Sequence, residues 1–458
     1  RADTATTNNK GNKAEMDRIV ILGAAESGVG AAVLAKQKGL DVFVSDMGTI
    51  KDKYKQMLDS HGIEWEEGQH TEAKILNATE IVKSPGIPSE VPMVQKAIDK
   101  GIGIISEIEF AARYTDAKMV CITGSNGKTT TTSLIYHIFK AAGYNVGLGG
   151  NIGRSLALQV AEGAHQWYVI ELSSFQLENM YRFKAHIAVL LNITPDHLDR
   201  YNYRMQGYVD AKMRILQNLG PQDYFIYWAD DPVVKPELQK YDVSARICPF
   251  AENRETGAAA YVSDGQITLS APLDFNMPQA RLSLPGKHNL YNSLAAALAA
   301  RAAGIPQDVV EQGLSDFPGV EHRMERVATM HGVNYINDSK ATNVDACRYA
   351  LEAMTAPTIL IIGGKDKGND YEPIKDLVKE KCAALVYLGA DNTKLHQNFD
   401  HLGLPVADTH SMKECVTACA GMAKAGYTVL LSPCCASFDL FKNMEDRGEQ
   451  FKTLVRNL

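Results

Sequence analysis

The sequence predicts an α/β protein built from three domains. Short apolar runs rich in β-branched residues alternate with segments of helical periodicity, a pattern typical of βαβ units and largely parallel sheets. A strand followed by a glycine-containing turn recurs near residues 18, 119 and 358. The 458 residues suffice for several domains that each bury a core, at roughly 100 to 200 residues per domain.

The predicted strands follow one another along most of the chain. They cover residues 18–22, 42–45, 119–123, 168–170, 188–191, 358–362, 384–388 and 428–431. Between about residues 241 and 284 the apolar alternation becomes short, which predicts a small antiparallel β insertion. Residues 1–15 are polar and lack periodicity, so we expect a disordered tail there. We place the three domains at residues 16–106, 107–319 and 320–458.

The composition argues against several classes of protein. Hydrophobic residues make up 45% of the chain and charged residues 22%, as in ordinary globular proteins. A net charge of −7 argues against a protein that coats nucleic acid, because such binding needs clustered Lys and Arg. No apolar run approaches the roughly 18 residues that span a bilayer, and the first residues lack the apolar core of a secretory signal. We expect a cytoplasmic protein with reduced cysteines and no nucleic-acid or membrane partner.

The first strand leads into a glycine turn, Gly23-Ala-Ala-Glu-Ser-Gly28, followed by a helix expected to begin near Val29. The dinucleotide fingerprint GxGxxG requires glycine where this chain has Ala25, which weakens a nicotinamide interpretation. Asp46 ends the next strand, where a ribose-binding acid would lie. A nucleotide site and a purely structural turn both remain open.

The second glycine loop is more specific. Thr123-Gly-Ser-Asn-Gly-Lys-Thr-Thr130 lies between a predicted strand and a predicted helix. Backbone N–H groups of such a loop bind phosphate oxygens, Lys128 can reach the β and γ phosphates, and the Thr129 hydroxyl can ligate Mg²⁺. The glycine spacing is two residues shorter than in the standard P-loop. We interpret it as a phosphate-binding loop, with a chance glycine turn as the alternative.

Polar residues follow several further strands. Glu171 ends one of them and could hold Mg²⁺, or it could be a solvated carboxylate. His197 is a candidate metal ligand or simply a hydrogen-bonded histidine. Further polar clusters occupy residues 286–292, 321–323, 337–343, 363–368 and 432–437. Each alone could be a cap or turn, but together they favour a functional site.

In these motifs the sequence resembles the ATP-dependent Mur ligases of bacterial cell-wall synthesis, over about residues 17–458. The segments that carry the resemblance are 123–130, 149–153, 171–177, 192–201, 337–343 and 432–443. The resemblance implies a Rossmann-like N-terminal domain for the UDP moiety and a central P-loop-type ATPase domain with a mostly parallel sheet and the antiparallel insertion. It also implies a Rossmann-like C-terminal domain that closes over ATP and the incoming amino acid.

The resemblance also implies a reaction. ATP phosphorylates a substrate carboxylate, an amine attacks the acyl phosphate, and a tetrahedral intermediate collapses to the amide. The Ser-Lys-Ala-Thr-Asn segment at 339–343 favours D-glutamate as the amine and UDP-N-acetylmuramoyl-L-alanine as the acceptor, in peptidoglycan precursor synthesis. We expect these two small-molecule partners and a monomer.

Site residues are carried over by position. The residues implied for ATP are Gly124, Asn126, Gly127, Lys128, Thr129, Thr130, Asn289, Asn292, Arg323 and Asp338. Those implied for the UDP-substrate are Ser27, Gly28, Asp46, Ser84, Pro85, Gly86 and Asn151. Those implied for D-glutamate are Lys340, Thr342, Lys367, Ser437 and Phe438.

Two Mg²⁺ ions are implied as cofactors, held by Thr129, Glu171, His197 and Lys212. Lys128, His197 and Lys212 are the implied catalytic residues. Lys212 matches the family lysine that is carbamylated by CO₂, and a carbamate supplies the hard oxygen atoms that Mg²⁺ prefers. Without the family, Lys212 would be interpreted as an ordinary lysine on a helix surface.

Two positions depart from the family pattern. Asp46 is followed by Met47 rather than by the arginine that meets the uracil, and Met444 replaces an aromatic residue near the amino-acid pocket. Three alternatives stay open. They are a sister Mur-type or folylpolyglutamate-type ligase with a different amino acid, a nicotinamide oxidoreductase that uses the Gly23 turn, and a nucleotide-driven switch without ligase chemistry.

Overall fold

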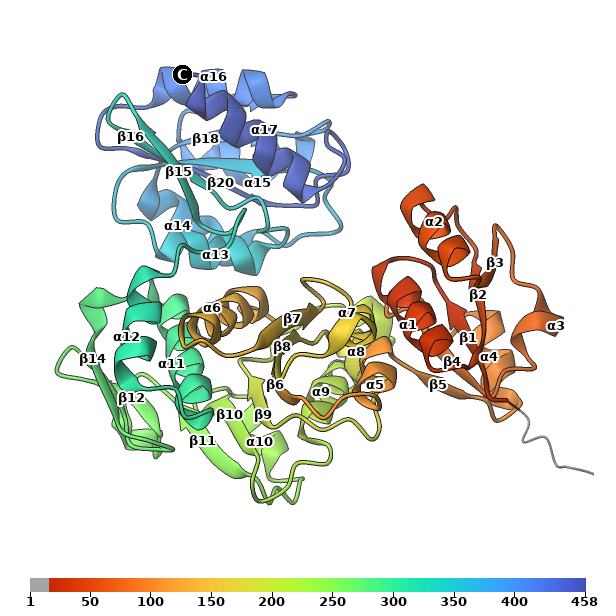
Figure 1. Cartoon of the computed structure of the whole chain (residues 1–458). Coiled ribbons are helices and arrows are strands. Elements are labelled where there is room, and N and C mark those ends of the chain that lie inside the picture. The colour runs from red at the N-terminus through yellow and green to blue at the C-terminus, as the bar shows by residue number, and fades with distance from the viewer. Residues whose placement is uncertain (1–15) are drawn as a thin grey trace, which may run out of the picture. The chain divides into compact units, whose positions relative to one another are not determined.

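The computed structural model describes residues 16–458, except for the side chain of Thr256 (Figure 1). The predicted disordered tail at residues 1–15 lies outside the described residues. Backbone contacts divide the chain into two compact units. The first unit contains the residues up to Gly124, 143–225 and 237–247, and the second contains 125–142, 226–236 and 248–458. Within residues 16–458 the strands form three sheets, so the predicted three-domain α/β class is confirmed.

The N-terminal sheet is wholly parallel, with the strand order β3-β2-β1-β4-β5. Its strands are β1 (Arg18–Leu22), β2 (Asp41–Asp46), β3 (Glu64–Glu67), β4 (Glu80–Lys83) and β5 (Gly103–Ile105). Its helices are α1 (Glu26–Gln37), α2 (Asp52–Ser60), α3 (Glu72–Ile75), α4 (Pro92–Asp99) and α5 (Glu107–Ala112). The strand order reverses between β1 and β4, and open α/β sheets bind ligands at the carboxyl ends of strands beside such a switch point.

Helix α1 begins at Glu26, so the expected start near Val29 was wrong. Its first turn lies directly over the preceding turn, where a Cβ atom on Gly28 would be 1.8 Å from the Gly23 carbonyl oxygen. Glycine is therefore required at position 28 for the helix to begin this early.

The central sheet has the strand order β14-β13-β12-β11-β10-β9-β6-β8-β7. Its strands are β6 (Lys118–Thr123), β7 (Val146–Gly150), β8 (Trp167–Glu171), β9 (Ile187–Leu190), β10 (Tyr224–Trp228), β11 (Arg246–Phe250), β12 (Ala260–Ser263), β13 (Gln266–Leu269) and β14 (Phe275–Pro278). Strand β6 pairs in parallel with both β8 and β9. The carboxyl ends of these three strands therefore meet at one edge.

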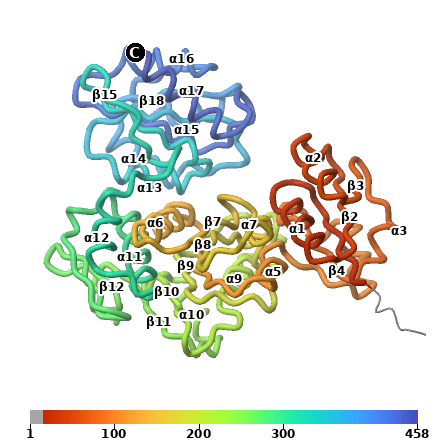
Figure 2. Tube along the Cα trace, viewed as in Figure 1, coloured from red at the N-terminus to blue at the C-terminus, as the bar shows by residue number. Residues whose placement is uncertain are grey.

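Helices connect and cover these strands. They are α6 (Lys128–Ala141), α7 (Leu156–Gly163), α8 (Ser174–Leu177), α9 (Met205–Met213), α10 (Val234–Leu238), α11 (Lys287–Ala302) and α12 (Gln307–Asp316). Short 3₁₀ helices are η1 (Leu198–Tyr201), η2 (Arg214–Leu216), η3 (Arg254–Thr256) and η4 (Gln279–Arg281). Helix α6 packs against α11 and α12 in the second unit, although it lies far from both in sequence (Figure 2). The alanine-rich stretch of α11 is buried on every side, which suits close helix packing.

The expected antiparallel insertion is present. Strands β12, β13 and β14 pair antiparallel, whereas β11 makes a short parallel pairing with β12.

The C-terminal sheet has the order β15-β16-β20-β17-β18-β19, with β15 antiparallel to β16 and the other pairings parallel. Its strands are β15 (Glu325–Met330), β16 (Val333–Asn337), β17 (Thr358–Gly363), β18 (Cys382–Leu388), β19 (Val406–Thr409) and β20 (Thr428–Cys434). Its helices are α13 (Val344–Glu352), α14 (Glu372–Lys381), α15 (Thr393–Phe399), η5 (Asp400–Leu402), α16 (Met412–Met422) and α17 (Met444–Arg456).

Strand β17 shows how this sheet is covered on both faces. Leu360 and Ile362 pack into a core with α13, α14 and α15, while Ile359 and Ile361 pack into a core with α16 and α17. Figure 1 shows α13 and α14 on one side of the sheet and α16 and α17 on the other. A continuous apolar run is therefore required, because alternate side chains enter two different cores.

Among the described residues, no helix is both long enough and apolar enough to cross a membrane.

Candidate functional site

The glycine loop ends where helix α6 begins. Gly127 caps the helix in the left-handed region at φ +87°, and a Cβ atom there would lie 2.4 Å from Oδ1 of Asn292 on α11. Only glycine fits both the conformation and the space. The N–H groups of the helix N-terminus and the loop point in the arrangement that typically binds phosphate. The structure thus places Asn292 directly against the predicted phosphate loop.

Two predicted residues from distant parts of the second unit meet at this loop. The Lys340 Nζ atom, in the loop after β16, donates a hydrogen bond of 3.0 Å to the Thr129 hydroxyl. Lys128 Nζ donates a hydrogen bond of 3.2 Å to the Ser125 carbonyl oxygen. A cation therefore lies at the hydroxyl that we expect to ligate Mg²⁺, and a second cation lies within the loop.

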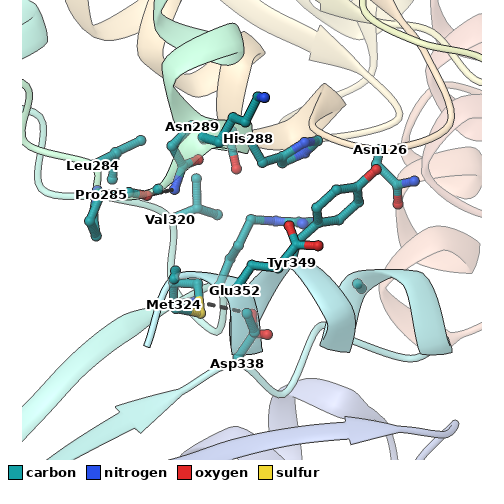
Figure 3. A pocket seen from close by; sticks show the side chains of 17 residues that line it. Asn126, Leu284, Pro285, His288, Asn289, Val320, Met324, Asp338, Tyr349 and Glu352 are labelled. Atoms are coloured by element: carbon teal, nitrogen blue, oxygen red, sulfur yellow. Dashed lines mark hydrogen bonds between the residues drawn. The ribbon is translucent and has the colours of Figure 1, made fainter. Parts of the chain in front are cut away.

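A pocket within the second unit brings together five of the predicted ATP residues (Figure 3). These residues are Asn126, Thr130, Asn289, Arg323 and Asp338. Apolar groups such as Pro285, Met324 and Ala350 line the rest of the pocket. A mixed lining of this kind is typical of nucleotide and cofactor sites.

Two aromatic rings lie face to face in the same pocket. The His288 ring on α11 stacks on the Tyr349 ring of α13, with centroids 4.1 Å apart and an interplanar angle of 18° (Figure 3). Burial lowers the pKa of His288 to about 4, and the nearby Arg323 and Arg348 guanidinium groups add to the shift. The imidazole is therefore neutral at physiological pH.

Asp338 is fully enclosed at the base of the pocket. Its Oδ1 accepts a hydrogen bond of 3.1 Å from the Met324 N–H, and its Oδ2 accepts one of 2.9 Å from the Ser432 hydroxyl. Burial raises the pKa of Asp338 to about 6, although Arg323 and these hydrogen bonds oppose the shift. A carboxylate with a raised pKa beside an arginine is a common feature of functional sites.

The predicted metal carboxylate lies in the first unit. Glu171 is buried at the end of β8, and its Oε1 accepts a hydrogen bond of 3.2 Å from Asn151 Nδ2. The Asn151 N–H also donates to the Glu171 carbonyl oxygen at 2.8 Å. A Cβ atom on Gly150 would lie 2.1 Å from that carbonyl, so glycine permits this close approach.

Lys212 is buried, which overturns its interpretation as a surface lysine. It lies on α9, and its Nζ donates a hydrogen bond of 3.3 Å to the Thr123 hydroxyl at the end of β6. His197 has a left-handed backbone at φ +50°, an exposed side chain, and a ring packed edge-on against Phe175.

Six of the predicted UDP-substrate residues lie at the carboxyl edge of the N-terminal sheet, whereas the seventh, Asn151, follows β7 of the central sheet. Asp46 Oδ2 accepts a hydrogen bond of 2.7 Å from the Ala24 N–H, and its Oδ1 accepts one of 2.7 Å from the Gly48 N–H. A Cβ atom on Gly23 would lie 2.7 Å from the Ser84 Cβ atom. The turns after β1, β2 and β4 are thus adjacent, at the switch point of the sheet.

The predicted D-glutamate residues differ in exposure. Ser437 is buried after β20, whereas Thr342, Lys367 and Phe438 are exposed. Lys365 and Ala436 form an isolated bridge between the loops after β17 and β20. The structure therefore connects these loops directly.

Three family models match successive parts of the chain. They describe a MurD N-terminal domain at residues 18–93, a Mur ligase middle domain at 122–300, and a Mur ligase glutamate ligase domain at 322–435.

Full-length relatives agree with these matches. The chain is 64% identical to UDP-N-acetylmuramoylalanine–D-glutamate ligase of Bacteroides fragilis over 97% of this chain and all of the relative. It is 55% identical to the protein of the same name from Porphyromonas gingivalis, with the same coverage of both chains. The chain belongs to the Mur ligase family.

Solved structures resemble this Mur ligase in fold. UDP-N-acetylmuramate-alanine ligase from Thermotoga maritima aligns with a TM-score of 0.61 at 17% identity, covering 96% of this chain and 99% of the other. MurF from Acinetobacter baumannii aligns with a TM-score of 0.62 at 16% identity, covering 96% and 93%.

Sequence reasoning missed an arginine of this Mur ligase. Arg447 on α17 is buried and donates to the Ser339 hydroxyl, the Ser339 carbonyl and the Cys435 carbonyl at 2.9, 2.7 and 3.0 Å. It thereby ties the Ser339–Lys340 loop to the loop after β20. Its polar helix gave no sign of this, because an arginine on such a helix is normally solvated.

Sequence reasoning also missed a buried carboxyl group in the first unit. Glu107 accepts hydrogen bonds of 2.6 Å from the Ser155 hydroxyl and 2.8 Å from the Ala157 N–H, at the start of α7. Burial raises the pKa of Glu107 to about 7. A glutamate at the start of the short helix α5 gave no sequence signal for such burial.

Proposed function

We propose that this Mur ligase is an ATP-dependent amide ligase that adds D-glutamate to UDP-N-acetylmuramoyl-L-alanine in peptidoglycan precursor synthesis. The observation that carries the proposal is the full-length similarity to enzymes named for that reaction. The pocket shared by Arg323, Asp338 and Asn289 supports the ATP-dependent part independently.

The proposed reaction has two covalent steps. The carboxylate of the L-alanyl group attacks the γ-phosphorus of ATP and releases ADP, which gives an acyl phosphate. The D-glutamate amine then attacks the acyl carbon, loses a proton, and the tetrahedral intermediate expels inorganic phosphate as the amide forms. One ATP is consumed for each amide bond.

The cations of the second unit suit the first step. Lys128 in the phosphate loop would hold the β and γ phosphates, and Arg323 and Lys340 would oppose the negative charge of the transferred group. ATP, an acyl phosphate and glutamate bring many negative charges together, so fixed cations are needed before the amine can approach. The exclusion of water would protect the acyl phosphate from hydrolysis.

The donor groups fit Mg²⁺. The Thr129 hydroxyl and the buried Glu171 carboxylate are hard oxygen ligands, and His197 is a further candidate. The bound ions would neutralise phosphate charge. A free Lys212 ammonium would repel such an ion. Once the ammonium has lost a proton, addition of CO₂ to the neutral Nζ amine with loss of a second proton gives an anionic carbamate. The Thr123 hydroxyl, 3.3 Å from Nζ, could donate a hydrogen bond to it. We therefore propose two Mg²⁺ ions and a carbamylated Lys212.

The roles of the domains follow from this proposal. Residues 16–106 would bind the UDP-substrate through Ser27, Gly28, Asp46, the 84–86 turn and Asn151 of the next domain. Residues 107–319 would bind ATP, and residues 320–458 would bind D-glutamate through Lys340, Thr342, Lys367, Ser437 and Phe438. All eight cysteines lie within residues 16–458 and are thiols rather than disulfides, which supports a cytoplasmic location. We further propose that the enzyme acts as a monomer.

The test is phosphate release from ATP with UDP-N-acetylmuramoyl-L-alanine and Mg²⁺. D-glutamate is compared with L-glutamate, L-alanine, L-lysine and diaminopimelate, and the amide is identified by mass spectrometry. We expect release and product only with D-glutamate. Release with another amino acid would indicate a sister ligase, and ATP turnover without any amino acid would favour a nucleotide switch.

A further inference from the structure

The segment that carries Arg323 has an unusual backbone. The residues on both sides of Arg323 are left-handed, His322 at φ +64° and Met324 at φ +45°. Neither is glycine, and such conformations cost free energy unless the surroundings hold them. The contacts around the turn His322-Arg323-Met324 must therefore stabilise this left-handed backbone.

Asn337, fully buried at the end of β16, holds the turn from one side. Its Nδ2 donates to His322 Nδ1 at 2.9 Å and to Glu325 Oε2 at 3.0 Å, while its Oδ1 accepts from the Ser339 N–H at 3.1 Å. The amide orientation is thus fixed by three partners. His322 Nδ1 must be an acceptor, so the imidazole carries its proton on Nε2.

Helix α17 encloses the ring from the other side. A Cβ atom on Gly448 would lie 2.1 Å from His322 Nδ1, so the bare helix backbone packs against the imidazole. One turn later, the buried Lys452 ammonium pairs with Glu321, Glu325 and Glu449. Glu321, His322 and Glu449 have a spacing that could hold a metal ion, but the Lys452 ammonium already occupies the space between the two carboxylates and pairs with both. These ion pairs therefore connect α17 to the residues beside the turn and stabilise it, rather than forming a metal site.

The turn His322-Arg323-Met324 contains one residue of the proposed site, Arg323, and forms hydrogen bonds with two others, Lys340 and Asp338. The His322 carbonyl accepts a hydrogen bond of 3.0 Å from the Lys340 N–H, and the Met324 N–H donates to Asp338 Oδ1 at 3.1 Å. Arg323 and Asp338 both line the nucleotide pocket.

We propose that His322 is a positioning residue: its imidazole, held between Asn337 and Gly448, fixes the turn that places Arg323, Asp338 and Lys340 for ATP. This inference rests on the proposed function for its ligand. It assigns no chemical step to His322, because its ring is enclosed by Asn337 and α17.

Two substitutions of His322 distinguish the role of the imidazole ring from the role of the left-handed backbone conformation. Glycine adopts a positive φ without strain but has no ring, so a purely conformational role predicts that His322→Gly is harmless. We expect instead that His322→Gly weakens binding of a non-hydrolysable ATP analogue about tenfold, the equivalent of one or two hydrogen bonds. Asparagine tolerates a positive φ and places an acceptor oxygen near the Nδ1 position, so His322→Asn should retain most of the affinity.

A substitution on α17 tests the enclosure without touching the turn. Gly448→Ala adds a methyl group against the ring, and Gly421→Ala on α16 is the matched control because a Cβ atom there meets nothing within 4 Å. We expect Gly448→Ala to raise the KM for ATP more than the KM for UDP-N-acetylmuramoyl-L-alanine, whose proposed residues lie outside this turn, and Gly421→Ala to change neither. Thermal unfolding shows whether each variant is folded.

The outcomes distinguish the two proposals. Unchanged nucleotide affinity in folded His322→Gly, or equal increases in every KM in Gly448→Ala, would overturn the positioning role. Absence of the D-glutamate product with the unsubstituted chain would overturn the proposed function instead. Calorimetry with the ATP analogue needs no ligase reaction, so it still tests His322 in that case.

Discussion

The Nζ atom of Lys340 donates a hydrogen bond of 3.0 Å to the hydroxyl of Thr129, 211 residues earlier in the chain. Thr129 lies in the first turn of the phosphate-loop helix, and Lys340 follows a strand of the C-terminal sheet. Both lie in the second compact unit. The protein fold itself therefore holds the hydroxyl proposed to bind Mg²⁺ next to the cation proposed to stabilise the transferred phosphoryl group.

We expect Lys340→Met to lower kcat by about 100-fold, because it removes a cation that would stabilise developing charge. Lys340→Arg should restore part of the rate, since it keeps the charge but not the geometry. Steady-state kinetics with saturating ATP tests this. A loss that appears only in the KM for ATP would contradict the assignment to the phosphoryl-transfer step.

Lys128→Ala should abolish ATP-dependent product formation, because the ammonium would hold the β and γ phosphates. The chain should remain folded, because the side chain is only partly buried. Lys140→Ala, on the exposed face of the same helix, is the matched control. Product is measured by mass spectrometry and folding by circular dichroism. Near-normal activity in Lys128→Ala would show that the loop does not hold the triphosphate.

Lys212→Ala should be inactive and should regain part of its activity with added short carboxylates such as formate or acetate. The truncated side chain leaves space in a buried position, where a small carboxylate could replace the proposed carbamate. Sodium chloride at equal ionic strength is the control. Full activity without added carboxylate would mean that Lys212 has no part in binding metal.

Glu107 provides a prediction about pH and stability. Burial raises its pKa from 4.5 to about 7, so the folded state binds a proton more tightly than the unfolded state. The group therefore destabilises the fold progressively as pH rises from about 4.5 to 7, and fully above that range.

Glu107→Gln removes this cost and keeps an acceptor for the Ser155 hydroxyl. Its melting temperature relative to the unsubstituted chain should rise between pH 5 and pH 8, roughly the range of this titration. The exposed Glu380→Gln should show no such trend. A constant difference across the range would indicate that Glu107 does not titrate there.

Several strands were predictable from the sequence because buried parallel strands are continuous apolar runs, whereas shorter or less apolar strands, such as β3 and β7, were not predicted. Residues 18–22 form a strand with the predicted bounds, and β17 extends only one residue beyond its prediction. The start of α1 was predicted three residues late, because the Gly23–Gly28 contact depends on a close packing that periodicity does not encode.

The site was only partly predictable for a similar reason. Five predicted ATP residues share one pocket, since strand ends and helix starts converge by topology. The burial of Lys212 and Arg447 was not predicted, although Lys212 shares a helix face with Tyr208 and Val209, and Arg447 shares one with Phe451 and Val455. A long cationic side chain on such a face normally extends to solvent. Their roles depend on which neighbouring loops come near, which is a property of the tertiary fold.

The eight cysteines offer a practical opportunity for spectroscopy. All are buried, and burial raises the pKa of Cys435 to about 11 and that of Cys121 still further. Maleimide dyes react with accessible thiolate, so the native thiols should remain unlabelled under mild conditions. A cysteine introduced at any exposed position would then carry the fluorophore alone, and pairs of such positions could report domain movement during turnover without a cysteine-free background.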